Sequence, residues 1–311
     1  MQDAPYHADV ADGPDGAAAH WLSTSDGLRI RTVLWTGPAV RGTVLLFPGR
    51  TEYAEKYGRA ARALLAGGYA TLAVDWRGQG LADRLHDDPG MGHVLRFPDY
   101  QHDVAAVLAH ARALGLPEPF HLIAHSMGGA IGLRAVIEGL PVASALFSAP
   151  MWGILMTRTL RSLAWTLSTF GPALGLLDKV VPGQSTLNTF GEMTLAENEL
   201  THDPEMFAYM QRQVVAHPEL GIAGPSVRWL REALLETARL NEKPSPDLPV
   251  LTFLGSDETI VDHGRIHNRM ARWPRGELVQ IDGGKHEMLM EIPSIRNEVF
   301  RRGLALFDAQ T

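Results

Sequence analysis

The stretch that decides the fold of this chain reads Phe120-His121-Leu122-Ile123-Ala124-His125-Ser126-Met127-Gly128-Gly129-Ala130-Ile131-Gly132. Its apolar start, bounded by Pro117 and Pro119, has the length of a buried strand. The small residues after Ser126 lead into residues 133–138, which have the composition of a helix. Ser126 therefore falls at a sharp turn from strand to helix, where its hydroxyl is exposed and the next backbone amides point the same way.

The residues around Ser126 depart at one place from the Gly-x-Ser-x-Gly pattern of such turns, because Ala124 stands at the first glycine position. Alanine is still small enough for a sharp turn. The alternative is a serine–glycine loop with no chemistry. The strand before Ser126 and the helix after it favour a nucleophile.

The composition is that of an ordinary globular protein, with 311 residues of which 45% are hydrophobic and 20% charged. The net charge of −7 argues against nucleic-acid partners and against electrostatic docking on an acidic membrane. The chain has no cysteine, so thiol chemistry is excluded. Neither a secretory signal nor a transmembrane segment is expected, because the longest uncharged run, residues 162–177, is shorter than the about 20 residues that a span needs.

Buried apolar runs alternate with helical segments along most of the chain. Strands are expected at residues 28–35, 42–47, 70–75, from 120, 143–147, 249–254 and 278–281, and helices at 54–65, 100–114, after 126 and 294–307. This alternation predicts an α/β protein with a doubly wound, mostly parallel sheet.

The alternation stops in one long segment, which we call the insertion. The expected organisation is a flexible N-terminal arm at 1–20, an α/β core at 21–150 and 243–311, and a helical cap or lid, the insertion, at 151–242. The insertion begins close to the nucleophile, and the bulky apolar Met151 and Trp152 at its start are expected to line an acyl pocket. The alternative is a helical elaboration that touches no substrate.

Three kinds of chemical group follow three predicted strands. Ser126 follows one strand, Asp257 and Glu258 follow the next but one, and His286 comes after the last. Because ligands bind beyond the carboxyl ends of parallel strands, these groups are expected to meet at one edge of the sheet. A serine hydroxyl needs a histidine as general base, and the histidine needs an acid to orient it and to stabilise its charged form.

The chain resembles the α/β-hydrolase superfamily, in which the order is also serine, acid, histidine. More narrowly, it resembles the bacterial lysophospholipase and monoacylglycerol lipase group over about residues 25–305. The motifs that carry the resemblance are Phe47-Pro48-Gly49-Arg50-Thr51-Glu52, Asp75-Trp76-Arg77-Gly78-Gln79-Gly80, Gly92-His93-Val94 with Phe97, Asp99 and Tyr100, and Ala124-His125-Ser126-Met127-Gly128-Gly129.

The resemblance implies roles for several residues. The family pattern Gly-x-x-Asp-x-x-Val starts here at Gly255, so Glu258 is expected to be the triad acid and Asp257 is the second choice. The backbone amides of Met127 and Arg50 are expected to form the oxyanion hole. The Arg50 side chain would meet a phosphate or pair with Glu52, and the pair is favoured.

Two further histidines lie near this predicted site. His125 precedes the nucleophile and is expected to be a packing or hydrogen-bonding residue, because its side chain points away from the face of the hydroxyl. His93 is expected to line the pocket.

The predicted function is a serine esterase that cleaves single-chain lipid esters, such as a lysophospholipid or a monoacylglycerol. A short-chain carboxylesterase, a thioesterase and an aminopeptidase share the triad and remain alternatives, as does a binding protein that has kept the fold without turnover. No cofactor and no metal are expected, because no phosphate-binding loop, dinucleotide motif or metal-ligand cluster appears. The expected location is the cytoplasm, and contact of the lid with the inner membrane is left open.

Overall fold

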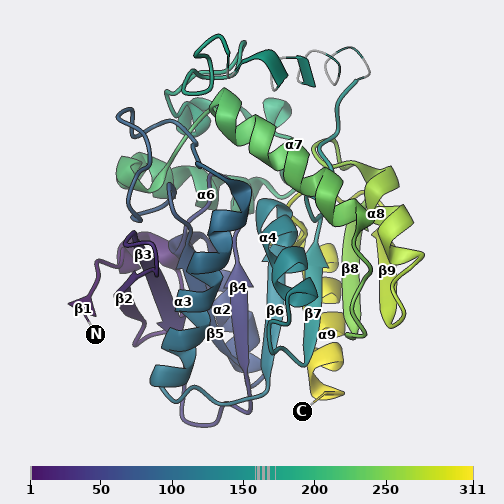
Figure 1. Ribbon diagram of the computed structural model, residues 1–311. Coiled ribbons are helices and arrows are strands. Elements are labelled where there is room, and N and C mark those ends of the chain that lie inside the picture. The colour runs from purple at the N-terminus through teal and green to yellow at the C-terminus, as the bar shows by residue number, and fades with distance from the viewer. Residues whose placement is uncertain are drawn as a thin grey trace.

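The computed structural model describes residues 2–157, 159, 162, 165–166, 169–171 and 173–310. Its centre is one sheet of nine strands in the order β1-β2-β3-β5-β4-β6-β7-β8-β9 (Figure 1). The strands are β1 Gln2–Asp3, β2 Ala18–Ser23, β3 Arg29–Trp35, β4 Thr43–Phe47, β5 Ala70–Asp75, β6 Phe120–His125, β7 Ser144–Ser148, β8 Val250–Gly255 and β9 Gly276–Ile281. The six strands from β5 to β9 in this order pair in parallel, and β1, β2 and β3 pair antiparallel.

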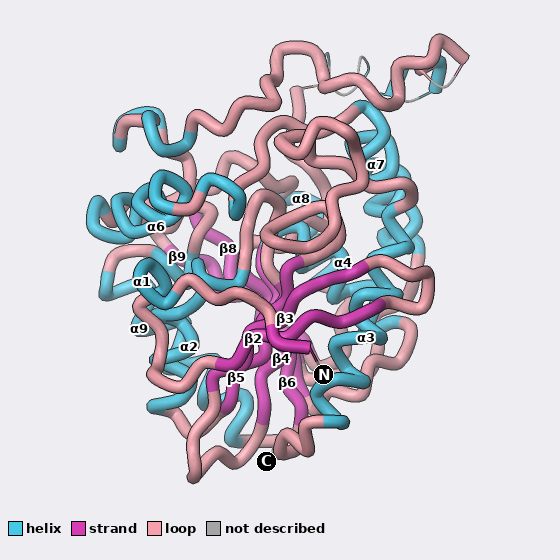
Figure 2. The backbone as a smooth tube through the Cα atoms, turned by 90° about the vertical axis from the view of Figure 1, so that its left-hand side faces the viewer, coloured by secondary structure: helices cyan, strands magenta, loops and turns pink. Residues whose placement is uncertain are grey.

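Helices cover both faces of the sheet, with α3 and α4 on one side and α2 and α9 on the other (Figure 2). The α-helices are α1 Ala8–Ala11, α2 Gly58–Ala66, α3 Tyr100–Ala113, α4 Ser126–Ile137, α6 Pro204–Ala216, α7 Val227–Glu242, α8 His263–Met270 and α9 Pro293–Asp308. Short 3-10 helices are η1 Ala54–Tyr57, η2 Phe97–Asp99, η3 Phe190–Glu192, η4 Leu195–Glu197, η5 Pro218–Leu220 and η6 Met288–Met290. The predicted doubly wound α/β fold is confirmed.

Strand β4 shows why the sequence folds into layers. Successive side chains of a strand point to opposite faces. Leu45 and Phe47 accordingly join the core on the α3 and α4 side, whereas Val44 and Leu46 join the core on the α2 and α9 side. A strand buried on both faces must therefore be apolar at every position, which is the continuous run that the sequence shows.

The N-terminal residues differ from the expected loose arm, because they are hydrogen-bonded to the rest of the molecule. Strand β2 pairs with β3 along its whole length. The hydroxyl of Tyr209 in α6 donates to the carbonyl of Ala11 over 2.7 Å, and the amide of Gln213 donates to that of Val10 over 2.9 Å. These contacts also anchor the insertion, since α6 belongs to it.

No strand occurs in the described part of the insertion, which carries helices α6 and α7 above the carboxyl ends of the strands (Figure 1). Tyr209, Met206 and Met210 of α6 are buried in the core on the α2 and α9 side, and Trp229 of α7 is buried in the other core. Both helices thus pack on the α/β core. No helix among the described residues has the length and apolar character to cross a membrane.

A buried ion pair network joins the early strands. The guanidinium of Arg31 in β3 donates to Asp75 in β5 over 2.7 Å and to Glu55 in η1 over 2.5 and 2.7 Å. All three side chains are fully buried. Asp75 also accepts from the amides of Ala54 and Leu81, so the network holds the loop after β4 against the sheet.

Replacement of Arg31 by Met is expected to lower the free energy of unfolding by about 3–5 kcal/mol, because two carboxylates would stay buried without their cation. Arg29→Met on the same strand is the matched control. Arg29 pairs with Asp83 at the surface, so its loss is expected to cost less than about 1 kcal/mol. Urea denaturation measures both variants, and equal losses would contradict the importance of this network.

Candidate active site

Ser126 lies at the turn between β6 and α4 with a backbone φ of 49°. This left-handed conformation is unfavourable for a residue with a side chain, so the surrounding packing must hold it. The glycines that follow permit that packing. A Cβ atom on Gly128 would lie 2.1 Å from the carbonyl oxygen of Phe47, and one on Gly129 would lie 2.5 Å from Pro150 Cβ. The sharp turn from strand to helix that the sequence predicts at Ser126 is present.

His286 and Glu258 form a buried hydrogen-bonded pair. His286 Nδ1 donates to Glu258 Oε2 over 2.6 Å. Glu258 Oε1 accepts from the amides of Ile260 and Val261 over 2.5 and 3.1 Å. Burial raises the pKa of Glu258, but the bond to His286, the charge of His286 and the two amides outweigh it and lower this pKa overall. Glu258 therefore remains ionised and orients the imidazole.

Asp257 points elsewhere. Its carboxylate is exposed and is hydrogen-bonded by His202 Nε2 over 3.1 Å and by the Ser256 hydroxyl over 3.0 Å. Between the two neighbouring acids, the structure thus places Glu258 and not Asp257 on His286.

Ser126 follows β6 and His286 follows β9, and both lie at the carboxyl-end edge of the sheet. The ring of His286 lies 4.7 Å, centroid to centroid, from the ring of His125, the residue before Ser126. Since Nδ1 faces Glu258, Nε2 is the nitrogen available to the serine. Within the described part of the chain, the Ser126 hydroxyl makes no hydrogen bond to His286. Such bonds often tighten only when substrate is bound.

The loop after β4 holds Arg50 in a defined orientation. The side-chain amide of Gln79 donates to the carbonyl of Gly49 over 3.0 Å and accepts from the amide of Thr51 over 3.2 Å. Glu52 accepts from the amide of Gly49. These bonds bracket the Arg50 peptide on both sides. Met127 lies in the first turn of α4, where backbone amides lack intrahelical acceptors.

A cluster of four buried ionisable side chains, Glu52, Lys56, His125 and Glu287, lies directly behind these loops. Lys56 Nζ is 2.5 Å from Glu52 Oε1 and 2.5 Å from Glu287 Oε1. His125 Nδ1 donates to the carbonyl of Ser148 over 3.0 Å, and its Nε2 lies 3.5 and 3.4 Å from the same two carboxylate oxygens.

Among the described residues, His125 Nδ1 is hydrogen-bonded to Ser148, whereas Nε2 faces the two carboxylates without forming a hydrogen bond. Burial lowers the pKa of His125, but the charges of Glu287 and Glu52 outweigh it and raise this pKa overall. The two carboxylates thus favour the protonated form of His125. His125, expected to be a packing or hydrogen-bonding residue, belongs to this cluster of buried ionisable side chains.

The Arg50 side chain does not pair with Glu52, which corrects the favoured expectation. Glu52 is occupied by Lys56, by the hydroxyl of Tyr57 and by the Gly49 amide. Arg50 Nη1 instead donates to the carbonyl of Ala223 over 2.6 Å, and its guanidinium lies 5.4 Å from the ring centroid of Trp229.

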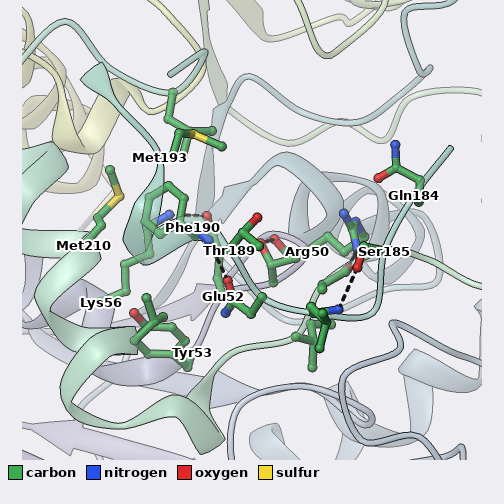
Figure 3. Close-up of a pocket in the computed structure, with 18 residues that line it drawn as sticks. Arg50, Glu52, Tyr53, Lys56, Gln184, Ser185, Thr189, Phe190, Met193 and Met210 are labelled. Atoms are coloured by element: carbon green, nitrogen blue, oxygen red, sulfur yellow. Dashed lines mark hydrogen bonds and ion pairs between the residues drawn. The ribbon is translucent and has the colours of Figure 1, made fainter. Parts of the chain in front are cut away.

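A pocket of about 300 Å³ opens beside the Arg50 loop (Figure 3). One wall comes from the core and includes Arg50, Glu52 and Lys56. The facing wall comes from the insertion, with polar Gln184, Ser185, Asn188 and Thr189 and apolar Leu187, Phe190, Met193, Leu200 and Met210. The lining therefore offers hydrogen-bond donors to an anionic group and apolar surface to an acyl chain.

The three residues expected to line the pocket lie elsewhere. Trp152 is buried, donates from Nε1 to the carbonyl of Gly129 over 3.1 Å and stacks on Trp273. Met151 is buried in the same core, and His93 Nδ1 is hydrogen-bonded with the Ser226 hydroxyl over 2.9 Å. Met151 and Trp152 pack in the core because the chain turns back onto it directly after β7.

Lys56 and Glu287 were missed by the sequence reasoning. The spacing of Glu52 and Lys56 by four residues was a usable signal, since side chains four apart meet on a helix. Glu287 offered none, because its partner lies 231 residues away along the chain.

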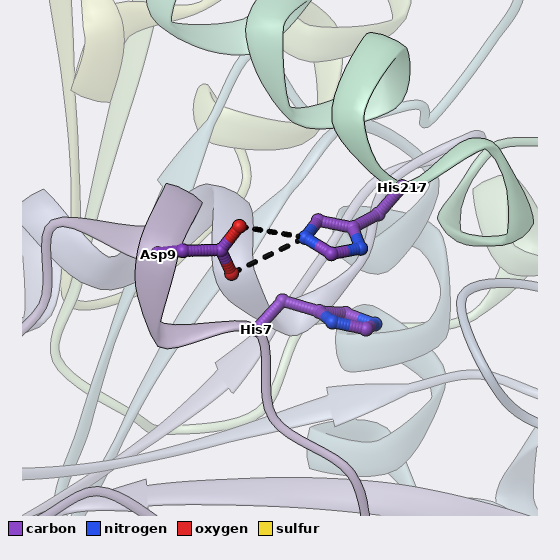
Figure 4. A group of neighbouring side chains, drawn as sticks. All are labelled: His7, Asp9 and His217. Carbon is purple, nitrogen blue, oxygen red and sulfur yellow. Dashed lines mark hydrogen bonds and ion pairs between the residues drawn. The ribbon is translucent and has the colours of Figure 1, made fainter.

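Among the described residues, two groups bring together three side chains of the kinds that bind metals. In the first, Glu52, His125 and Glu287, the ammonium of Lys56 already lies between the carboxylates. In the second, the rings of His7 and His217 stack at 3.7 Å, and His217 Nε2 lies 2.9 Å from Asp9 (Figure 4). The bond to Asp9 outweighs burial and raises the pKa of His217. Charge pairing accounts for both groups.

Comparison with known proteins agrees with the α/β fold described above. The family model described as serine aminopeptidase, S33, matches residues 38–293. Lysophospholipase L2 of Escherichia coli K12 is 30% identical over 290 residues, covering 88% of this chain and 82% of that protein. Monoglyceride lipase of Saccharomyces cerevisiae is 25% identical over 275 residues, covering 84% and 82%.

Solved structures show the same fold. A soluble variant of the Saccharomyces cerevisiae monoglyceride lipase in complex with a substrate analogue has a TM-score of 0.71 at 24% identity, covering 93% of this chain and 94% of that one. The resemblance to the α/β-hydrolases is thereby confirmed. The chain belongs to the serine aminopeptidase S33 family of α/β-hydrolases.

Proposed function

We propose that this protein is a serine hydrolase that cleaves the carboxylic ester of a single-chain lipid, a lysophospholipid or a monoacylglycerol. The observation that carries the proposal is the buried Glu258–His286 pair beside the strained turn of Ser126. The names of the relatives, lysophospholipase L2 and monoglyceride lipase, support the substrate class. The pocket beside Arg50, with both polar and apolar lining, supports an amphiphilic ligand.

The reaction follows from the roles of these side chains. His286 Nε2 removes the proton of the Ser126 hydroxyl as its oxygen attacks the ester carbonyl. The amides of Arg50 and Met127 bind the oxygen on which negative charge develops. His286 then protonates the departing alcohol, and an acyl group remains on Ser126. Water, activated by the same histidine, releases the fatty acid.

The insertion supports contact with a lipid surface. Among the described residues, large apolar side chains that are exposed gather on it, namely Leu155, Trp165, Phe170, Leu174, Leu187, Leu195 and Val215. Apolar side chains in such numbers on one segment favour an interface with lipid, from which a single-chain ester would enter.

The buried cluster explains how three separate loops stay in register. Glu52 and Lys56 follow the Arg50 loop, His125 precedes Ser126, and Glu287 follows His286. The cluster thus binds together the segments that carry the oxyanion donor, the nucleophile and the base. We propose that its charges position these segments for catalysis.

Ser126→Ala is expected to abolish hydrolysis of 1-palmitoyl lysophosphatidylcholine and of 1-palmitoylglycerol, with kcat falling by about 10⁴–10⁶ because no acyl-enzyme can form. A fluorophosphonate is expected to label wild-type Ser126 and not the variant. Turnover of short aryl esters with neither lipid cleaved would point to a carboxylesterase. A wild-type protein that takes no label would favour a binding protein.

Substitutions of Glu258 and Asp257 allow a matched test of which acid orients His286. Glu258→Gln is expected to lower kcat by about 10⁴, because His286 loses the group that fixes its tautomer and its charge. Asp257→Asn is expected to leave kcat within about twofold, since its carboxylate contacts His202 and not His286. Steady-state kinetics on one aryl ester compares them, and a larger loss for Asp257→Asn would overturn the assignment.

The raised pKa of His125 predicts how stability depends on pH. A histidine whose pKa is higher in the folded state contributes its full stabilisation below its unfolded pKa of about 6.5, and loses it as pH rises through the folded value. The free energy of unfolding of the wild type is therefore expected to fall as the pH rises above about 6.5. Urea titrations at several pH values test this against His125→Asn, in which that decline is expected to shrink. An identical decline in both proteins would show that His125 is neutral.

A further inference from the structure

Arg50 is a cation with no carboxylate beside it. Arg269 is a second such arginine, but its guanidinium donates to the carbonyls of Leu240 and Lys243 and to the Ser245 hydroxyl. Among the described residues, the one hydrogen bond from the Arg50 side chain goes to the uncharged carbonyl of Ala223. Burial lowers the pKa of Arg50 to about 10, so the side chain is still charged at neutral pH. Arg31 and Arg77 are buried too, yet neighbouring carboxylates raise the pKa of each.

The charge of Arg50 is also not needed by the cluster behind it. In that cluster the carboxylates of Glu52 and Glu287 each lie 2.5 Å from Lys56 and within 3.5 Å of His125. Among the described residues, Arg50 is therefore a positive charge without a carboxylate partner on the wall of the 300 Å³ pocket (Figure 3). A partly desolvated guanidinium with unused donors binds anions strongly, and its planar fork suits phosphate.

The guanidinium and the proposed oxyanion donor belong to the same residue, so the number of bonds between them can be compared with that in a substrate. The Arg50 amide is the proposed donor to the ester carbonyl, and the side chain carries the guanidinium six bonds from that amide nitrogen. In a lysophospholipid that is acylated at the terminal glycerol carbon, the phosphorus likewise lies six bonds from the carbonyl carbon. One residue can therefore span both groups of a single substrate.

We propose that the Arg50 side chain forms an anion subsite that binds the phosphate of the substrate's headgroup, while the Arg50 amide holds the carbonyl of the same molecule. The inference rests on the proposed function and refines it. It makes the phosphate-bearing lysophospholipid the preferred substrate over the uncharged monoacylglycerol. Gln184, Ser185 and Asn188 on the facing wall supply further polar contacts to the headgroup.

The first test measures the ratio of kcat/KM for 1-palmitoyl lysophosphatidylcholine to that for 1-palmitoylglycerol. This ratio is expected to fall about 10-fold to 100-fold in Arg50→Gln and less in Arg50→Lys, since a charge-assisted contact is lost with one substrate alone. Arg96→Gln, which removes an exposed arginine paired with Asp99, is the control and is expected to keep the wild-type ratio. An unchanged ratio in Arg50→Gln would overturn the proposal.

The second test uses competition against hydrolysis of a short aryl ester, which has no phosphate. Glycerol 3-phosphate is expected to inhibit the wild type competitively, with an inhibition constant about 10-fold higher in Arg50→Gln, whereas glycerol inhibits both proteins equally. Inorganic phosphate that inhibits as well as glycerol 3-phosphate, together with an unchanged substrate ratio, would indicate a site for free phosphate and contradict a headgroup subsite.

Labelling of Ser126 by a fluorophosphonate separates this inference from the proposed function. Arg50→Gln that still takes the label has a folded, reactive site, so its substrate ratio reports on the subsite. A wild-type protein that takes no label, or that cleaves neither lipid, would refute the proposed function itself.

Discussion

The arrangement of this site depends on a pair of carboxylates that share buried cations. Glu52 and Glu287 come from loops at opposite ends of the sequence, and Lys56 lies 2.5 Å from each. A buried carboxylate without a cation is strongly unfavourable. If either loop moved away, a buried charge in the other would lose part of its pairing. Arg50 and His286 lie within two residues of these carboxylates along the chain. The pairing of the buried charges therefore also restrains the positions of Arg50 and His286.

Ser126 is held in a strained backbone conformation by the packing around it. A non-glycine residue with φ of 49° is disfavoured by about 1–3 kcal/mol, and the surroundings must compensate for it. Gly128 and Gly129 let the first turn of α4 approach the loops after β4 and β7 to distances that exclude any side chain. His125 continues this restraint from the other side through its contacts with Ser148 and with the buried carboxylates. The serine is therefore held on both sides by groups that do not react.

The insertion has a part that is anchored to the core and a part whose apolar side chains are exposed. Helices α6 and α7 are anchored to the core, as the bonds from Tyr209 and Gln213 to the N-terminal residues show. Between them and β7, the described side chains include a series of exposed apolar ones. The proposed contact with lipid would therefore involve side chains outside the segments that form the buried cluster.

The strands from β3 to β9 and the positions of Ser126 and His286 after strands could be predicted from the sequence, because each depends on a short local pattern, whereas the choice of Glu258 over Asp257 came from the family resemblance. An apolar run of five or six residues specifies a buried strand wherever it lies, and a polar residue directly after it must lie at the sheet's edge. The pairing of β2 with β3 was not predicted, since its mixed polar and apolar residues resemble a loop.

Only the tertiary structure decided the direction of the Arg50 side chain, the burial of Met151 and Trp152, and the carboxylates that face His125. Each of these results from competition between groups that lie far apart along the chain. Lys56, whose ammonium reaches Glu287 231 residues away, occupies the carboxylate of Glu52 and leaves Arg50 facing the pocket. Local sequence determines which residues are available, whereas the free energy of burying charges together determines which of them pair.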